Sequence, residues 1–209
     1  ESVILCRVRE KKIHVLLNSC RHRGMKVCLY DEGNTTNFTC PYHTWSYATD
    51  GALVGVPMEK ALYEGMDKSQ WSLIEVAQMA NYKGTIWATW DKHAPSFLEY
   101  IGGFQTYLDF LLDTWDGAGG ETEVFGGIEK WVIPCNWKFP AENFIGDRYH
   151  NISHRSVDLV GIGPSGTGRR DTNERVRSRL LVVCFPERGH GTVMGLRPAD
   201  TQINDSYQQ

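Results

Sequence analysis

Two short motifs of cysteine and histidine constrain this chain more than any other feature of its sequence. They are Cys20-x-His22 and Cys40-x-x-His43. Each follows a β-prone run and contains a residue suited to a sharp turn, Gly24 in the first motif and Pro41 in the second. Two thiolates and two imidazoles held in this way can bind either a structural zinc ion or a [2Fe–2S] centre.

The distribution of the ligands separates these alternatives. Zinc fingers usually pair Cys with Cys and His with His, whereas each motif here holds one Cys and one His. Cys20 and Cys40 can therefore reach one iron while His22 and His43 reach the other, as in a Rieske-type centre. We favour this [2Fe–2S] cluster and keep structural zinc as the alternative. Histidine ligation raises the potential of such a cluster to roughly −150 to +300 mV, against roughly −400 mV for plant-type ferredoxins.

A second group of polar residues lies in residues 136–154. Asn143, Asp147, His150 and His154 follow one another at helical spacing, so one helix face would carry all four. Two imidazoles one turn apart can bind iron(II) together with a carboxylate, and Asp147 could orient His150. The alternative is a solvated polar helix face with incidental histidines.

Periodicity predicts a β-rich first part and a mixed second part, hence an α+β fold. A helix is expected to begin at Pro95-Ser96, with an apolar core stripe running to Leu112. The all-β domain is assigned to residues 1–92 and the second, catalytic domain to residues 93–209. The expected strands are residues 3–8, 13–17, 85–90, 124–125, 129–134 and 180–185.

Composition excludes several classes of protein. A net charge of −3 over 209 residues gives no reason to expect a nucleic-acid partner, and no apolar run is long enough to span a membrane. The remaining cysteines show no disulfide framework, so we expect reduced thiols in a cytoplasmic protein. Glu1 stands where a chain would begin with Met, which suggests a fragment. Residues 161–166 formally spell a dinucleotide fingerprint but lack its βαβ context, so we interpret them as a surface or lid loop.

The residues around both sites resemble a known family. Cys20-Arg-His-Arg-Gly and Cys40-Pro-Tyr-His-Thr-Trp-Ser-Tyr, followed by Asp50-Gly51, resemble the Rieske motif of bacterial aromatic-ring-hydroxylating dioxygenase α subunits. Residues 136–150 are similar to the corresponding segment of naphthalene and polycyclic-hydrocarbon dioxygenases. The fold implied is an all-β Rieske domain followed by the first part of a catalytic domain with an antiparallel sheet and helices.

This resemblance implies roles for the second group. His150 and His154 would bind a mononuclear iron(II), although relatives usually place one or two more residues between these histidines. Asp147 would pass electrons between a Rieske histidine of a neighbouring subunit and His150. Asn143 and Phe144 would lie beside the substrate pocket. The family's third iron ligand is a downstream carboxylate that we do not find in this chain.

The resemblance also implies the reaction and its partners. Electrons from NADH would arrive through a reductase and a ferredoxin, and both atoms of dioxygen would enter an aromatic hydrocarbon to give a cis-dihydrodiol. A β subunit and further α subunits, as α3β3 or α3, are the implied assembly. The alternatives are a Rieske monooxygenase or demethylase acting on a substituted aromatic ring, and an electron-transfer protein alone. We expect the 209 residues by themselves to be inactive.

Overall fold

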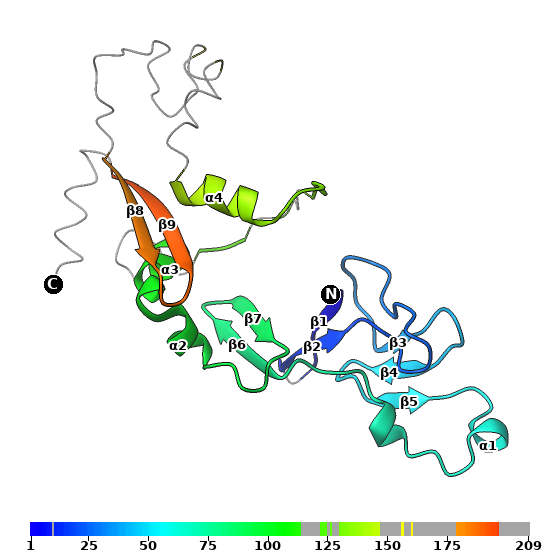
Figure 1. The fold of residues 1–209 in the computed structure, drawn as a ribbon. Helices are drawn as coiled ribbons and strands as arrows, with labels where there is room; N and C mark the ends of the chain where they lie inside the picture. The colour runs from blue at the N-terminus through cyan, green and yellow to red at the C-terminus, as the bar shows by residue number, and fades with distance from the viewer. Residues whose placement is uncertain are drawn as a thin grey trace. The chain divides into compact units, whose positions relative to one another are not determined.

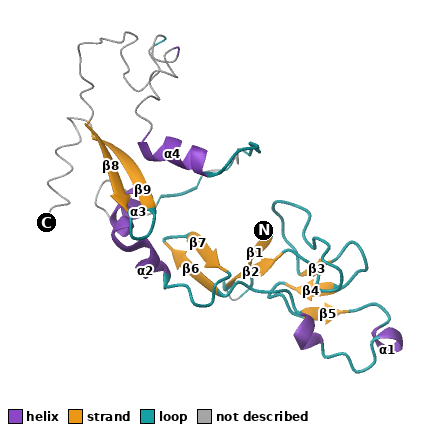
Figure 2. Cartoon of the chain, viewed as in Figure 1, coloured by secondary structure: helices purple, strands orange, loops and turns teal. Residues whose placement is uncertain are grey.

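The computed structural model describes residues 1–9, 11–113, 122–124, 126, 130–146, 156, 160 and 179–196. The chain divides into two compact units, Glu1–Phe97 and Leu98–Gln209, whose elements are labelled in Figure 1. In the described residues all strand pairs are antiparallel and the helices are short, as Figure 2 shows. The predicted α+β class is therefore confirmed, while the domain limits of 1–92 and 93–209 stay a prediction.

The first unit begins with an antiparallel hairpin of β1 (Val3–Arg7) and β2 (Ile13–Leu17). Its turn is closed by the Val8 amide, which donates to the Lys12 carbonyl at 2.9 Å. Ile4 on β1 is buried between exposed neighbours, and the centre of β2 is buried throughout. The hairpin predicted from the two β-prone runs is confirmed, and β2 leads directly into the first cysteine motif.

A sheet of three short strands carries the second cysteine motif. Its order is β3-β4-β5, and β3 ends immediately before Cys40. The strands are β3 (Asn37–Thr39), β4 (Ser46–Ala48) and β5 (Leu53–Gly55). Because β3 pairs with β4, the residues between them form a tight loop that projects from one end of the sheet.

A further hairpin joins β6 (Gln78–Tyr82) and β7 (Thr85–Thr89). Lys83 and Gly84 between them have φ values of 47° and 82°, which is the left-handed backbone that a two-residue type I′ turn requires. The sequence predicted β7 but missed β6, because its Gln-Met-Ala-Asn-Tyr run has no β-branched residue.

Between β5 and β6 the chain leaves the sheets in an excursion that carries two short helices. They are α1 (Glu59–Leu62) and the 3₁₀ helix η1 (Lys68–Trp71). The Asp67 carboxylate caps η1 by accepting from the Ser69 amide at 3.0 Å. Lys68 Nζ lies 3.1 Å from Glu59 Oε2, so an ion pair joins the two helices.

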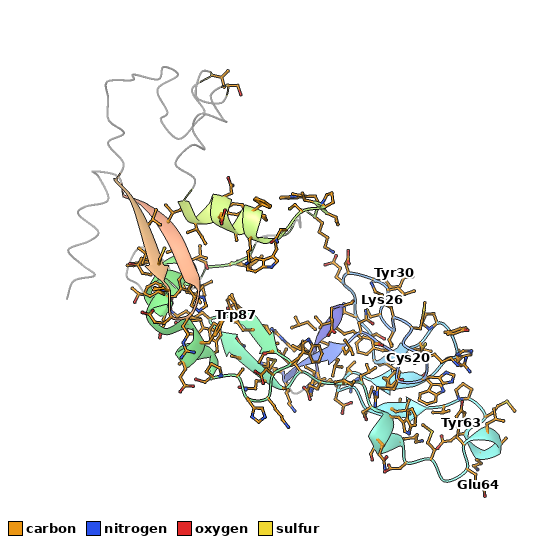
Figure 3. All side chains as sticks on the ribbon, viewed as in Figure 1. Cys20, Lys26, Tyr30, Tyr63, Glu64 and Trp87 are labelled. Carbon is orange, nitrogen blue, oxygen red and sulfur yellow. The ribbon has the colours of Figure 1, made fainter. Side chains whose placement is uncertain are left out.

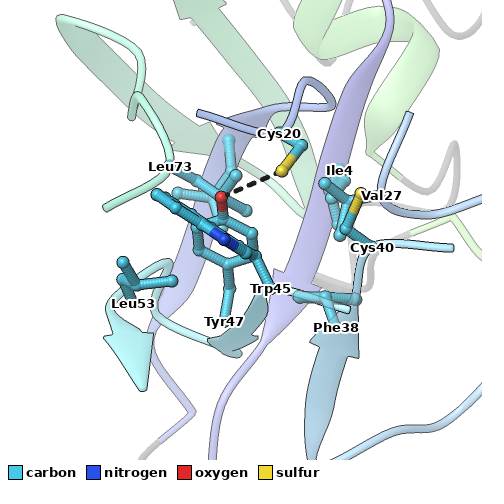
Figure 4. Packing of buried hydrophobic residues seen from close by; sticks show 10 residues of the cluster. Ile4, Cys20, Val27, Phe38, Cys40, Trp45, Tyr47, Leu53 and Leu73 are labelled. Atoms are coloured by element: carbon cyan, nitrogen blue, oxygen red, sulfur yellow. Dashed lines mark hydrogen bonds between the residues drawn. The ribbon is translucent and has the colours of Figure 1, made fainter. Parts of the chain in front are cut away.

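Buried side chains of the first unit form one apolar core, shown in Figure 4. Cys20 and Cys40 of the two motifs belong to it, so the motif loops are attached to the buried core of the unit. The core consists of Ile4, Leu16, Cys20, Val27, Phe38, Cys40, Trp45, Tyr47, Leu53 and Leu73.

A helical run that the sequence predicted begins at the last residue of the first unit and continues in the second. The run consists of α2 (Phe97–Ile101), the 3₁₀ helix η2 (Gly102–Phe104) and α3 (Gln105–Leu112). Ile101 and Leu108 are buried, whereas Leu98 and Leu111 are exposed. The helix is thus confirmed, but only part of its apolar stripe is core.

The described remainder of this unit is a helix beside a hairpin. The elements are α4 (Lys138–Gly146), β8 (Arg179–Phe185) and β9 (His190–Leu196). Ile145 of α4 packs closely on β9, since a Cβ added at Gly191 would lie 3.2 Å from the Ile145 side chain. The predicted strand at 180–185 is confirmed as β8, while its partner β9 was not predicted.

One strand prediction was wrong. Lys130–Pro134 lies in no strand, and its apolar side chains Trp131, Val132 and Ile133 are exposed. A strand needs a neighbouring strand to satisfy its backbone groups, and β-prone composition alone does not supply one. Val124 is likewise outside any strand, and Phe125 and Glu129 lie outside the described residues. None of the described helices has the length and hydrophobicity needed for a membrane span.

Candidate metal centre

The first motif forms a tight loop directly after β2. The Cys20 amide donates to the Met25 carbonyl, and the Gly24 amide returns a bond to the Cys20 carbonyl, each at 2.8 Å. Gly24 has a φ of 75°, a left-handed backbone that costs a non-glycine residue about 1–2 kcal/mol. The sharp turn predicted at Gly24 is therefore present, and it presents the side chains of residues 20–23 from one loop.

The second motif repeats the same backbone pattern. The Cys40 amide donates to the Trp45 carbonyl at 2.8 Å, and the Thr44 amide donates to the Cys40 carbonyl at 3.0 Å. Thr44 takes the place that Gly24 has in the first loop, with a φ of 57°. The sequence predicts the turn at Pro41 and gives no sign of the left-handed residue at Thr44, because a β-branched residue is not expected in left-handed backbone.

The four candidate ligands divide by burial into two layers. Cys20 and Cys40 are 3% and 2% exposed, whereas His22 is half-buried and His43 is exposed. The imidazole rings of His22 and His43 contact each other with their centroids 4.8 Å apart. The two loops therefore offer a buried pair of thiols and an outer pair of imidazoles.

This donor set fits a two-iron cluster better than a single zinc ion. A tetrahedral zinc site requires three or four ligands converging on one point. The thiols and the imidazoles of the two motifs instead lie in two layers, one buried and one nearer the surface. A Rieske-type cluster requires only a cysteine pair and a histidine pair, which is the division observed.

Tyr47 on β4 connects the two loops to the core. Its hydroxyl lies 3.2 Å from Cys20 Sγ and accepts a hydrogen bond from the Arg21 amide at 3.0 Å, and Figure 4 marks the contact with Cys20. Burial raises the pKa of Tyr47 above its usual range, and the bond with Cys20 raises it further. Tyr47 therefore stays a neutral phenol that can donate to the Cys20 sulfur. Its place in the run after His43 was noted in the sequence, but this contact was not predicted.

A flat stack of rings supports His22. The imidazole lies on the indole of Trp45 with centroids 4.9 Å apart and an interplanar angle of 9°. Partial burial lowers the pKa of His22, and the charges of His43 and Arg23 lower it further. Each of these causes favours the neutral imidazole, which is the form that binds metals.

Asn18 fastens the first loop to the end of β2. This buried side chain accepts bonds from the Val27 and Cys28 amides, both at 2.9 Å, and donates to the Cys28 carbonyl at 2.7 Å. A second donor contact reaches Ser2 Oγ at 3.3 Å. Every hydrogen-bonding atom of the amide is thus in use, and the sequence analysis did not single this residue out.

The second predicted site is only partly within the described residues. Asn143 and Phe144 lie on α4 and are exposed, while the neighbouring Ile145 faces β9. Asp147, His150 and His154 lie outside the described residues, as does the loop of residues 161–166. All six cysteines of the chain are free thiols in the structure.

Comparison with known proteins places these observations in a family context. Residues 1–79 match the Rieske [2Fe-2S] domain family. The α subunit of biphenyl dioxygenase from Metapseudomonas furukawaii is 45% identical over 173 residues, covering 78% of this chain and 37% of that protein. The α subunit of N,N-dimethyl phenylurea N-demethylase from Sphingobium sp. (strain YBL2) is 41% identical over 160 residues, covering 76% and 34%.

A crystal structure of naphthalene 1,2-dioxygenase from Rhodococcus sp., bound to indole, is also similar. It superposes with a TM-score of 0.78 at 39% identity, over 94% of this chain and 42% of that one. The chain thus spans between 34% and 42% of the length of these three relatives.

Proposed function

Because this chain belongs with the α subunits of Rieske aromatic-ring dioxygenases, with a Rieske [2Fe-2S] domain in residues 1–79, we propose that it serves ring dihydroxylation. Cys20 and Cys40 would hold one iron of the cluster, and His22 and His43 the other. The observation that carries this assignment is the pair of equivalent loops, each with a buried thiol and an outward imidazole. When bound, the cluster would supply electrons one at a time, and a mononuclear iron would activate dioxygen beside an aromatic ring.

The residues after the described part of α4 would provide the mononuclear site. His150 and His154 would be its protein ligands, and Asp147 would bridge to a Rieske histidine of a neighbouring subunit. Support comes from α4 itself, which is helical as predicted up to Gly146, the residue before Asp147. Asn143 and Phe144 present exposed side chains on this helix, as groups beside a substrate pocket would.

The proposed reaction inserts both atoms of dioxygen into an aromatic hydrocarbon and gives a cis-dihydrodiol. NADH would be the electron source, through a reductase and a ferredoxin, and a β subunit and further α subunits would complete the assembly. Support for this class of substrate comes from the biphenyl and naphthalene dioxygenases among the relatives.

The first test asks whether the chain binds the cluster. We would purify it anaerobically, reconstitute it with iron and sulfide, and assay iron, sulfide and zinc in parallel. The proposal predicts two irons and two sulfides per cluster and a Rieske-type EPR signal on reduction. A colourless protein that binds zinc and does not bind iron and sulfide would instead support the structural-zinc alternative.

A second test addresses the reaction. The corresponding part of the biphenyl dioxygenase α subunit would be replaced by this chain, and the hybrid would be expressed with its β subunit, ferredoxin and reductase. Under ¹⁸O₂ the product should be a dihydrodiol carrying two labelled oxygens. A product with one labelled oxygen would contradict dihydroxylation.

Demethylation is the second candidate, because a demethylase α subunit is 41% identical to this chain. The same hybrid would be given N,N-dimethyl phenylurea, and formaldehyde would be measured. Formaldehyde release without dihydrodiol formation from biphenyl would favour this candidate. An electron-transfer protein alone is less well supported, since the likeness to naphthalene dioxygenase covers 94% of the chain.

A further inference from the structure

The two histidines of the candidate cluster have unlike surroundings. His43 is exposed, and its ring is contacted by the exposed Tyr42 at a centroid distance of 3.7 Å. His22 lies flat on Trp45, which is only 2% exposed. The core can restrain the His22 ring, because that ring packs on a buried side chain. It cannot restrain the His43 ring in the same way, because Tyr42 is exposed. His22 is therefore the histidine whose orientation the fold itself can determine.

Stacking on the indole of Trp45 can orient the His22 ring. Metal-binding histidines usually donate their second ring nitrogen to a carbonyl or carboxylate, which fixes the plane of the ring. For His22 the structure shows a different contact, the nearly parallel face of Trp45 at an interplanar angle of 9°. The torsion that turns an imidazole about its Cβ–Cγ bond is broad, so rotamer preference alone does not select one ring plane. The indole of Trp45, with its ring centroid 4.9 Å from that of His22, can select it.

Trp45 is itself held in place by two further rings. Trp71, at the end of η1, meets it edge to face at 5.7 Å, and Tyr63, which follows α1, does so at 5.9 Å. Both come from the excursion between β5 and β6, in which Figure 3 labels Tyr63. Trp71 is 39% exposed, so it forms the outer wall of this group of rings. The excursion thus acts as a support behind the indole that supports His22.

We propose that Trp45 is a positioning residue that sets the ring plane of His22 and thereby the geometry at the histidine-bound iron. The proposal rests on the assignment of His22 as a cluster ligand. It does not require Trp45 to touch the metal, because the indole acts through the imidazole. Residues that orient metal ligands typically change metal affinity by about 10–100-fold when they are replaced.

The test compares variants of the full 209-residue chain, reconstituted anaerobically with iron and sulfide. Trp45→Phe keeps a flat face, whereas Trp45→Leu keeps an apolar side chain without one. The readouts are the g values and line widths of the reduced EPR signal and the rate of cluster loss to a chelator. Trp45→Phe should resemble the native chain, and Trp45→Leu should give a broadened, shifted signal and lose its cluster about 10–100-fold faster.

Two controls separate stacking from general damage. Trp87→Leu removes a tryptophan of β7 whose ring lies tilted against that of Phe97 and which belongs to neither loop, so its EPR signal should be native. Leu53→Ala leaves a void in the same core without removing a ring. A destabilised core with a native EPR signal is the expected result for this variant.

Three outcomes would overturn the proposal. One is a Trp45→Leu signal identical to the native one, and another is a Leu53→Ala signal shifted as much as that of Trp45→Leu. If Trp45→Leu does not fold, Trp71→Leu takes its place, because it removes only the partly exposed outer wall. An unchanged EPR signal in Trp71→Leu would be the third outcome that overturns the proposal. A native chain that binds zinc in place of iron and sulfide refutes the proposed function itself, before any variant is compared.

Discussion

Replacing Tyr47 by Phe removes one oxygen atom from the centre of the candidate site and leaves the shape of the side chain unchanged. The side chain is 0% exposed, so water cannot take the place of the lost hydroxyl. Two contacts disappear together, the one with Cys20 Sγ at 3.2 Å and the one from the Arg21 amide at 3.0 Å. The effect of the substitution can therefore be worked out from hydrogen bonds alone.

The expected loss of stability is about 1–3 kcal/mol. A hydrogen-bonding group left without a partner beside a buried side chain costs about that much, and the part-buried bond from the Arg21 amide loses its acceptor. The expected loss of stability includes no cost for a cavity, because the Phe ring fills the same volume as the Tyr ring. Since a domain of this size is stable by about 5–15 kcal/mol, the variant should still fold. Urea unfolding of the metal-free chain measures the difference directly.

The same substitution should lower the reduction potential of the reconstituted cluster. A hydrogen bond donated to a cluster sulfur stabilises the reduced form, whose sulfur carries more negative charge. The raised pKa of Tyr47 keeps the phenol protonated and able to donate. Redox titration followed by EPR measures the shift, with Tyr30→Phe as the control, because Tyr30 is 85% exposed.

A Tyr47→Phe chain whose free energy of unfolding lies within about 0.5 kcal/mol of the native value, and whose cluster keeps its reduction potential, would refute both expected effects. Changes of that size are typical of surface substitutions away from specific contacts. Tyr30→Phe should fall in this range on both measurements. A shift as large in Tyr30→Phe as in Tyr47→Phe would also contradict the argument, because it would not come from the contact with Cys20.

The remaining predictions concern the loops and the first hairpin. Asn18→Ala should lower the free energy of unfolding in urea by about 2–4 kcal/mol, because two amides and one carbonyl lose their partner. A loss under about 1 kcal/mol would contradict the role of Asn18 in fastening the first loop. Gly24→Ala should destabilise the chain by about 1–2 kcal/mol, whereas Thr44→Gly should be neutral or stabilising by up to about 1 kcal/mol. Destabilisation by both substitutions would contradict the conclusion that both positions have left-handed backbone that favours glycine. Burial, then the charges of Asp50 and Glu75, raise the pKa of Cys6. Cys6 therefore keeps its proton to a higher pH in the folded chain than in the unfolded one, so the free energy of unfolding should be level below the usual pKa of a thiol and fall as the pH rises above it. Urea unfolding between about pH 7 and pH 10 tests this, and Cys6→Ser should flatten the decline.

The sequence alone was sufficient to predict the locally encoded elements and to identify the candidate ligands. Cys20 with His22, and Cys40 with His43, stand close together along the chain, so their mixed spacing by itself favours a two-iron cluster over zinc. The β1–β2 hairpin and the helix from Phe97 were predictable for the same reason, since their patterns lie within short windows. Where a pattern lacked β-branched residues, as in β6, or lacked a partner strand, as at Lys130–Pro134, local reasoning failed.

Tertiary structure decided what surrounds the ligands. Tyr47 reaches Cys20, and Trp45 reaches His22, only after β4 has paired with its neighbours and the two loops have met above one core. The left-handed backbone of Thr44 is imposed in the same way, by the hydrogen bonds that close its loop. Composition and spacing specify which atoms can bind a metal. The plane of a ring and the partner of a sulfur depend on residues distant in sequence, and burial brings those together only in the folded chain.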